Sequence, residues 1–177
     1  MKFIKGDLFN HDTSNTIIAH VVNDRGAMGS GFVLPLIEKY PLVLTEYKKW
    51  NDHIGTWSST YHGIEAGQGS LRQGVTQMVL LKADFYVANM CAQTLGKDRN
   101  LNYGHLATCM AYVSRFAKKF NFEIVCPLFG MDRAGGNPDF VMELVNDIWT
   151  ESDNNVTMYY QDNNQHLIEK YLGDKNV

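Results

Sequence analysis

The sequence has no apolar run long enough to cross a membrane, for which a helix needs about 20 such residues. Its N-terminus, residues 1–7, has no apolar stretch of the kind that a secretion signal contains. Positive charge is not in excess, because 16 Lys and Arg stand against 19 Asp and Glu and the net charge is -3. A general nucleic-acid binder needs a basic surface, so this class is disfavoured together with membrane and secreted proteins. We therefore expect a cytoplasmic protein.

Cysteine is also scarce. The three cysteines, Cys91, Cys109 and Cys126, form no Cys-x-x-Cys pair and no Cys/His ligand spacing, so we expect no zinc site. An odd number of cysteines without a secretion signal favours a reducing compartment. Each lies in an apolar context, which predicts small core residues. No metal and no cofactor is expected.

The order of elements predicts an α/β protein, because strand-like apolar runs alternate with amphipathic helical ones. The most apolar run, 16–22, is expected to be a central strand. We predict a three-layer α/β/α sandwich with a mixed, mostly parallel central sheet, formed by a single domain of residues 1–177. Within it, 161–177 form a C-terminal extension that could add a short helix. The other expected strands are 1–5, 76–82, 85–91, 122–127 and 155–160, and the expected helices are 32–40, 41–50 and 101–120.

A further helix is expected to begin at Asn137, which can cap it. Pro138 suits the first helical position, and Asp139 suits the positive end of the helix dipole. Its periodicity predicts a buried face made of Phe140, Val141, Leu144, Val145, Ile148 and Trp149. By contrast, 53–74 is rich in Gly, Ser and Thr and is expected to be a long connection with a short strand.

Two glycine-rich segments, 20–31 and 127–137, each leave an apolar strand and enter a helix. Glycine permits positive φ and a close approach of the backbone to a ligand, and free N–H groups in such loops bind anions. Ligands of open α/β sheets lie beyond the carboxyl ends of the strands, so the two segments together predict a pyrophosphate cradle. A plain strand-to-helix turn is the alternative for each. A dinucleotide-binding fold fits poorly, because the strict Gly-x-Gly-x-x-Gly pattern is absent.

Four motifs resemble those of the macrodomain family. They are Lys5-Gly6-Asp7-Leu8-Phe9, His20-x-x-Asn23, Met28-Gly29-Ser30-Gly31, and Pro127-x-x-Gly130 with Ala134-Gly135-Gly136-Asn137. Their order and spacing match from Met1 to about Tyr160. The His-x-x-Asn form resembles the branch that contains ADP-ribose-1''-phosphate phosphatases and terminal ADP-ribose hydrolases. The resemblance implies that the partner of this chain is a small molecule, ADP-ribose or a close derivative, bound without metal.

The resemblance also implies roles for individual residues. Asp7 should accept a hydrogen bond from the adenine amino group beside the Leu8 backbone, with a turn aspartate as the alternative. Asn23 should bind a distal ribose hydroxyl or position a water. Tyr159 or Tyr160 could border the adenine, and core packing is an equal option for Tyr160. The remaining expected contacts are Met28, Gly29, Ser30, Gly31 and Phe32 of the first loop, and Phe129, Gly130, Met131, Asp132, Arg133, Ala134 and Gly135 of the second.

The expected catalytic residues are His20, Asn23 and Asp132. A histidine has an unperturbed pKa of about 6.5, which suits proton transfer near neutrality, although a structural histidine is the alternative. Family members that remove ADP-ribose from glutamate use a lysine after the middle strand and an aspartate in the second loop. Here 88–93 contain no lysine and Ala134 stands at the aspartate position. We therefore favour hydrolysis of ADP-ribose-1''-phosphate, with a non-catalytic reader or sponge and a de-ADP-ribosylating hydrolase as alternatives.

Overall fold

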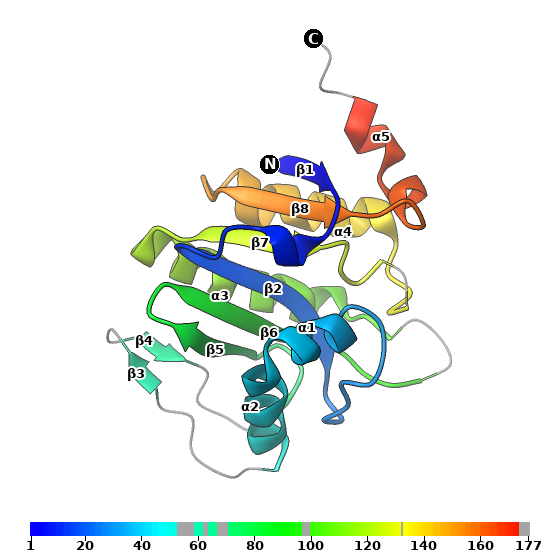
Figure 1. Cartoon of the computed structure of the whole chain (residues 1–177). Helices are drawn as coiled ribbons and strands as arrows, with labels where there is room; N and C mark the ends of the chain where they lie inside the picture. The colour runs from blue at the N-terminus through cyan, green and yellow to red at the C-terminus, as the bar shows by residue number, and fades with distance from the viewer. Residues whose placement is uncertain (53–58, 62–63, 67–70, 97–99, 132, 174–177) are drawn as a thin grey trace.

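The structure is a computed structural model that describes residues 1–52, 59–61, 64–66, 71–96, 100–131 and 133–173. Its centre is a six-stranded sheet with the strand order β1-β8-β7-β2-β6-β5 (Figure 1). Among these strands, β5 alone runs antiparallel to its neighbour, so the sheet is mixed and mostly parallel, as predicted. The strands are β1 (Lys2–Lys5), β2 (Thr16–Asn23), β5 (Thr76–Lys82), β6 (Phe85–Gln93), β7 (Glu123–Pro127) and β8 (Val156–Tyr160).

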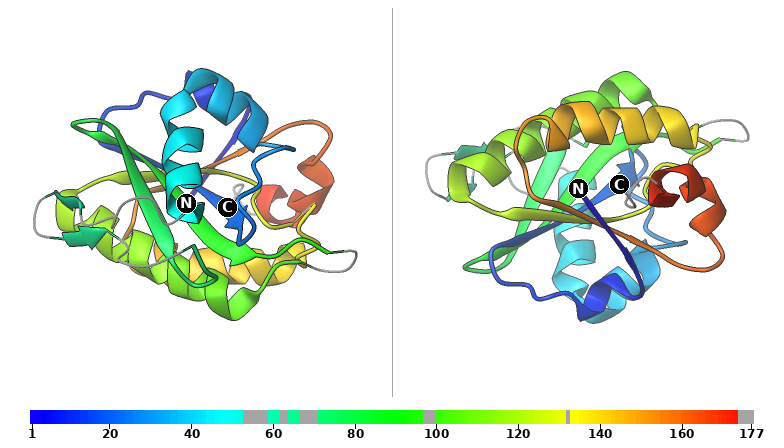
Figure 2. Two further views of the ribbon diagram at one scale, coloured as in Figure 1. Left: turned by 90° about the horizontal axis from the view of Figure 1, so that it is seen from below. Right: turned by 90° about the horizontal axis from the view of Figure 1, so that it is seen from above.

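Helices cover both faces of the sheet and complete the predicted three layers (Figure 2). One face carries α1 (Val33–Lys39) and α2 (Pro41–Asn51), and the other carries α3 (Tyr103–Phe120) and α4 (Pro138–Val145). A π-helical turn, Asn146–Thr150, extends α4. Short 3-10 turns lie at Leu8–Asn10 and Gln165–Leu167, and α5 (Glu169–Leu172) ends the described chain. Each helical layer has its own buried apolar cluster against the sheet.

Strand β2 lies inside the sheet between β7 and β6, which explains its composition. A strand buried on both faces needs apolar side chains on both, and every residue of β2 except Val21 is buried. Ile17 and Ala19 belong to the cluster under α3 and α4, whereas Ile18 and Val22 belong to the cluster under α1 and α2.

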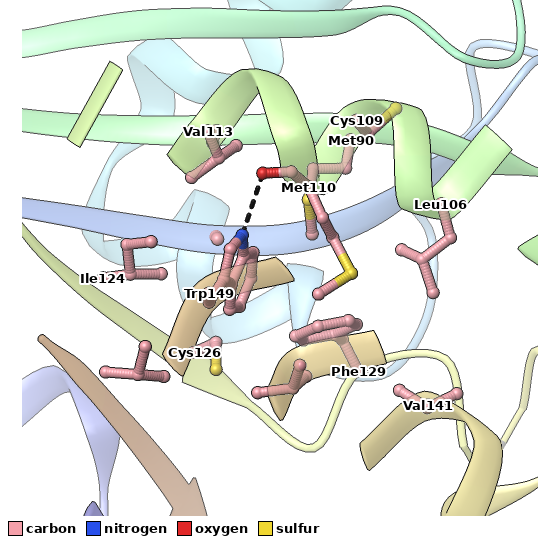
Figure 3. Close-up of a cluster of buried hydrophobic side chains, with 14 of the residues drawn as sticks. Met90, Leu106, Cys109, Met110, Val113, Ile124, Cys126, Phe129, Val141 and Trp149 are labelled. Atoms are coloured by element: carbon pink, nitrogen blue, oxygen red, sulfur yellow. Dashed lines mark hydrogen bonds between the residues drawn. The ribbon is translucent and has the colours of Figure 1, made fainter. Parts of the chain in front are cut away.

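The core between α3, α4 and the sheet is centred on Trp149, which is fully buried (Figure 3). Its indole Nε1 donates a hydrogen bond of 2.9 Å to the Met110 carbonyl oxygen, so the polar group of this large side chain is satisfied. The cysteines are buried core residues, as expected. Burial raises the pKa of the Cys91 thiol to about 12 and that of Cys109 to about 11, and both thiols are therefore unreactive at neutral pH.

Helix α4 confirms the predicted cap and corrects the predicted buried face. The Asn137 side chain accepts hydrogen bonds from the Asp139 and Phe140 N–H groups, at 2.9 Å and 3.4 Å. Phe140 was expected to be buried, yet 44% of it is exposed. It lies in the first turn of α4, beside the start of α3, where its ring packs on Tyr103 with centroids 4.5 Å apart. Met142 is buried in its place.

Two other segments differ in detail from their predictions. The stretch 53–74 contains two short strands instead of one, β3 (Ser59–Tyr61) and β4 (Ile64–Ala66), which pair with each other in a separate antiparallel sheet. The rest of 53–70 lies outside the described residues. The C-terminal extension does form the short helix α5, and Ile168 just before it is fully buried in the core.

Candidate functional site

The two glycine-rich loops lie next to each other in the structure. They follow β2 and β7, which are parallel neighbours in the sheet, so both loops leave the same edge. The carboxyl ends of β6 and β8 reach this edge as well, because these strands are parallel to β2 and β7. This is the edge where open α/β sheets bind ligands.

Two cavities adjoin at this edge, each with a volume of about 460 Å³. The first, here named the loop cavity, lies between the two loops above His20 and Asn23. The second, named the C-terminal cavity, lies between the 3-10 turn after β1, Tyr159 and the segment that follows β8. Both cavities are lined by Gly31, Phe32, Pro127, Leu128 and Arg133, so these five residues form their common boundary.

At this boundary the Arg133 side chain crosses the backbone of Gly31. Gly31 has a φ of +73°, which side-chain-bearing residues rarely adopt. A Cβ there would lie 3.7 Å from the Arg133 Cδ, an ordinary contact, so the backbone conformation and not space requires glycine. Arg133 is exposed and places a positive charge where the two cavities meet.

The second loop is closed by its own backbone. The Gly136 N–H donates a hydrogen bond of 2.8 Å to the Gly130 carbonyl oxygen. A Cβ at Gly136 would collide with that oxygen and with the Leu101 side chain, so only glycine fits. The Ala134 carbonyl accepts hydrogen bonds from the N–H groups of Asn100 and Leu101, at 3.1 Å and 3.0 Å, which fixes the middle of the loop to the segment before α3.

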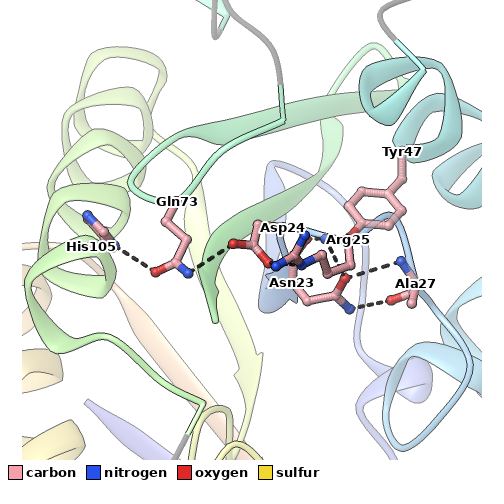
Figure 4. Close-up of polar contacts among 7 residues, drawn as sticks. All are labelled: Asn23, Asp24, Arg25, Ala27, Tyr47, Gln73 and His105. Carbon is pink, nitrogen blue, oxygen red and sulfur yellow. Dashed lines mark hydrogen bonds and ion pairs between the residues drawn. The ribbon is translucent and has the colours of Figure 1, made fainter. Parts of the chain in front are cut away.

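The first loop is braced by the side chain of Asn23 (Figure 4). Its Oδ1 accepts from the N–H groups of Arg25 and Ala27, at 2.9 Å and 3.2 Å, and its Nδ2 donates to the Ala27 carbonyl at 2.5 Å. The Tyr47 hydroxyl on α2 donates to the Asn23 carbonyl oxygen at 2.5 Å. Asn23 lines the loop cavity, but its side-chain oxygen is already engaged by the loop. Its contact with a ligand therefore stays a prediction.

A second polar chain connects the base of the first loop to α3 (Figure 4). Gln73 donates from Nε2 to the Asp24 Oδ2 at 3.1 Å. Its Oε1 therefore faces His105, whose Nδ1 lies 2.8 Å away and carries the donated proton. Asp24 also pairs with the Arg25 guanidinium at 3.6 Å. Together these contacts tie the loop to the segment before β5 and to the first turn of α3.

His20 lies in the second half of β2, between Ala19 and Val21, and lines the loop cavity. Only 2% of it is exposed, its Nε2 lies 2.6 Å from the Asn89 Oδ1, and its ring centroid lies 5.8 Å from that of Phe32. Burial lowers the pKa of His20 from 6.5 to about 4, since an apolar environment disfavours the charged ring. The pKa of His20 is therefore lower than the value of about 6.5 that suits proton transfer near neutrality, and the ring is neutral at pH 7.

Asp7 and Tyr159 lie on the C-terminal cavity. The Asp7 Oδ1 accepts from the Phe9 N–H at 2.9 Å and caps the 3-10 turn, which is the turn role given as the alternative for this residue. The Tyr159 hydroxyl lies 2.9 Å from the His11 Nδ1. Phe9 stacks on Phe32, with ring centroids 5.5 Å apart, so aromatic groups connect this cavity to the first loop.

Comparison with solved structures identifies the fold. The structure superimposes on a macrodomain protein from Streptomyces coelicolor with a TM-score of 0.73 and 27% identity, over 90% of this chain and 97% of that one. The chain has the macrodomain fold. A protein from Bacteroides thetaiotaomicron matches this chain with a TM-score of 0.77 and 25% identity, over 90% of this chain and 98% of that one. Thermosipho africanus DarTG in complex with ADP-ribose matches with a TM-score of 0.63 and 15% identity, over 89% of this chain and 41% of that one.

Sequence comparison adds two distant curated relatives and no protein-family model matches. Both relatives are named ADP-ribose 1''-phosphate phosphatase. The one from Meyerozyma guilliermondii is 34% identical over 65 residues, 36% of this chain and 35% of that protein. The one from Debaryomyces hansenii is 38% identical over 60 residues, 32% of each chain. The match thus spans about a third of the length of each curated relative.

Most of the residues that the sequence nominated for the site line one or both cavities. Asp132 lies outside the described residues. Met28 and Met131 lie in the two loops, but their side chains are buried in the two apolar clusters. Neither these methionines nor Gly135 line one of the two cavities. The nominated residues that do line one or both cavities are Asp7, Leu8, His20, Asn23, Gly29, Ser30, Gly31, Phe32, Phe129, Gly130, Arg133, Ala134 and Tyr159.

Sequence reasoning missed two parts of the macrodomain cavities. Gln93 and Leu95, at and after the end of β6, line the loop cavity. The parallel pairing of β6 with β2 would have indicated them, had the neighbouring strands been known. The C-terminal cavity is also lined by the extension, at Gln161, Asn163, Asn164 and Leu167, for which the sequence carries no signal.

Two further properties concern the described part of the chain alone. Within it, no group of three or more His, Cys, Asp or Glu residues is placed to hold a metal ion. Nor does any helix there combine the length and the apolar character that crossing a bilayer requires.

Proposed function

We propose that this macrodomain binds ADP-ribose-1''-phosphate along its two cavities and hydrolyses it to ADP-ribose and phosphate. The observation that carries the proposal is the pair of adjoining cavities between the glycine loops, with Gly31 and Arg133 at their boundary. In this arrangement the adenosine occupies the C-terminal cavity, the pyrophosphate lies at the boundary, and the distal ribose with its phosphate occupies the loop cavity.

Charge and donors support this orientation of the ligand. Arg133 supplies a guanidinium at the boundary, and a guanidinium suits phosphate oxygens. The C-terminal cavity has the carboxylate of Asp7 for the adenine amino group and Tyr159 as an aromatic wall. The ADP-ribose bound to the structurally similar DarTG, and the names of the two curated relatives, agree with an ADP-ribose-type nucleotide.

The hydrolysis needs a water that attacks phosphorus, while the bond from phosphorus to the 1'' oxygen breaks. His20 is neutral and buried, so it can accept a hydrogen bond from this water and orient it, whereas its pKa of about 4 makes it a poor base. It cannot be the acid that protonates the leaving oxygen, because its pKa of about 4 leaves no proton to give at neutral pH. Asp132 is the candidate that, as a carboxylate, takes the water's proton and passes it through a second water to the leaving 1'' oxygen. The loop N–H groups and Arg133 stabilise the charge that develops on the phosphate oxygens.

Phosphate release from ADP-ribose-1''-phosphate, measured beside calorimetric binding of ADP-ribose, AMP and NAD, tests the proposal. We expect release with the wild type, loss of release with His20→Ala and Asp132→Ala, and ADP-ribose binding tighter than AMP binding. NAD bound as tightly as ADP-ribose would point to a different pocket. Unchanged release in His20→Ala, Asn23→Ala and Asp132→Ala alike would refute the catalytic assignment.

A reader that binds without turnover is the second candidate, and one observation favours it. The Asn23 side chain is engaged in closing the first loop, so it is less available to position a water. In the same assay a reader would bind ADP-ribose tightly and release no phosphate. A de-ADP-ribosylating hydrolase of the lysine-dependent type is disfavoured, since no lysine lies in 88–93 and Ala134 occupies the aspartate position.

A further inference from the structure

A row of polar side chains crosses the sheet beside the loop cavity, on the face covered by α1 and α2. His20 on β2 is in register with Asn89 on β6, which is in register with Gln77 on β5. All three are buried, with 2%, 0% and 4% exposed. Hydrogen bonds join His20 Nε2 to Asn89 Oδ1 at 2.6 Å, Asn89 Nδ2 to Gln77 Oε1 at 2.9 Å, and Gln77 Nε2 to the Glu46 carbonyl oxygen on α2 at 2.9 Å.

The last hydrogen bond of this row fixes which group donates and which accepts in each of the others. A carbonyl oxygen can only accept, so Gln77 must present its Nε2 to Glu46 and its Oε1 to Asn89. Asn89 then donates from Nδ2 to Gln77 and presents its Oδ1 to His20. An amide oxygen also only accepts, so the proton of the neutral His20 ring must be on Nε2.

The other ring nitrogen of His20 is left without a partner. The Val21 backbone is a polar neighbour of the ring and partly opposes the lowering of its pKa. Nδ1 is nevertheless buried and makes no hydrogen bond among the described residues, although a buried polar atom normally has one. The row contains no carboxylate that could hold a charged ring, since the Glu46 side chain pairs instead with Lys49 at 2.9 Å. His20 nevertheless lines the loop cavity, where a hydroxyl or a water could donate to it.

We propose that Gln77 and Asn89 are positioning residues that hold His20 as the neutral Nε2–H tautomer, so that Nδ1 accepts a hydrogen bond from the ligand or its attacking water. The role of Nδ1 rests on the proposed function, whereas the tautomer does not. The row reaches from α2 through three strands to the cavity, so the packing of α2 on the sheet sets the proton position in the site.

Nitrogen NMR of the full chain labelled in its histidines tests the tautomer directly. The chain has six histidines, and the signals missing from His20→Gln assign His20. We expect the wild type to show a protonated Nε2 and an unprotonated Nδ1 at neutral pH. Asn89→Leu removes the acceptor and should produce a mixture of tautomers. Asn89→Asp places a carboxylate beside Nε2 and should raise the pKa of His20 by at least about one pH unit.

Thr76→Val is the matched control, because Thr76 is a buried neighbour of Gln77 whose hydroxyl bonds to the Cys109 carbonyl on the opposite face. It should leave the His20 signals unchanged. Under the proposed function, Asn89→Leu should lower kcat at least about 10-fold with little change in KM, a part of the roughly 100- to 10,000-fold that acid–base catalysis contributes.

The possible outcomes separate this inference from the proposed function. A wild-type ring protonated on Nδ1, or unchanged His20 signals in folded Asn89→Leu and Gln77→Leu, would overturn the positioning role. The expected signals in a wild type that releases no phosphate would support the tautomer and refute the phosphatase. Phosphate release that is unaltered in Asn89→Leu, despite mixed tautomers, would overturn the role of Nδ1.

Discussion

The first loop depends on the backbone conformation of Gly31, and Gly31→Ala tests this dependence. An alanine at a φ of +73° costs about 1–2 kcal/mol, because its Cβ approaches the following carbonyl. No further steric cost is expected, since the nearest described neighbour of this Cβ is the Arg133 Cδ at 3.7 Å. For a domain of this size such a loss lowers Tm by about 2–8 °C. ADP-ribose should also bind more weakly, because the strained loop lines both cavities.

Gly29→Ala is the matched control, two residues earlier in the same loop. Gly29 is not among the positive-φ glycines, and a Cβ there meets nothing within 4 Å. Alanine at such a position leaves stability unchanged or raises it by up to about 1 kcal/mol, because it restricts the unfolded chain. Denaturant unfolding followed by circular dichroism gives both free energies, and calorimetry gives the affinities. If Gly31→Ala proves as stable as Gly29→Ala, the argument from backbone conformation is wrong.

Asn23, Arg133 and His20 each provide a further test of the site. Asn23→Leu removes three hydrogen bonds of the loop, so the free energy of unfolding measured in denaturant should fall by about 1.5–4 kcal/mol; a loss below about 0.5 kcal/mol would contradict the bracing role. Arg133→Gln should change stability by less than about 0.5 kcal/mol because Arg133 is exposed, yet calorimetry should show ADP-ribose affinity about 10- to 150-fold lower and adenosine affinity unchanged. His20 binds a proton more readily when unfolded, at a pKa of 6.5, than when folded, at about 4, so its contribution to stability is complete above pH 6.5 and is lost as the pH falls toward 4. The free energy of unfolding of His20→Gln, measured at several pH values, should lack this part of the pH dependence, which amounts to about 3 kcal/mol. If the free energy of unfolding changes with pH equally in the variant and the wild type, the pKa of His20 is not lowered in the native state.

Local patterns in the sequence were sufficient to predict the helices, the strands and the two glycine-rich loops. The apolar run of β2, the amphipathic stripe of α3 and the Asn137-Pro138 start of α4 depend on neighbours in the chain, and each element formed where its pattern predicted it. Glycine at Gly31 similarly marks a positive φ, and glycine at Gly136 marks a position where a Cβ does not fit, so the residue type itself carries that information in the sequence.

Contacts between distant segments were beyond such reasoning. Phe140 was assigned to the core by helical periodicity, but its exposure depends on where α3 begins beside it. The pKa of His20 was expected near 6.5, and only the burial of the ring and its contact with Asn89, 69 residues away, reveal a value of about 4. The engagement of Asn23 with Arg25 and Ala27 is local in the sequence, but the motif that nominated Asn23 does not show which groups its side chain will bond.

The sequence by itself determined the layered α/β fold, the order of its elements and the identity of the two glycine loops, because periodicity, capping and glycine placement act over a few residues. The tertiary structure alone decided that the C-terminal extension lines a cavity, that Arg133 lies across Gly31, and that Gln77 and Asn89 reach His20. These relations depend on strand order and helix packing, which join residues far apart in the chain, and no local pattern records which distant side chain will be the neighbour.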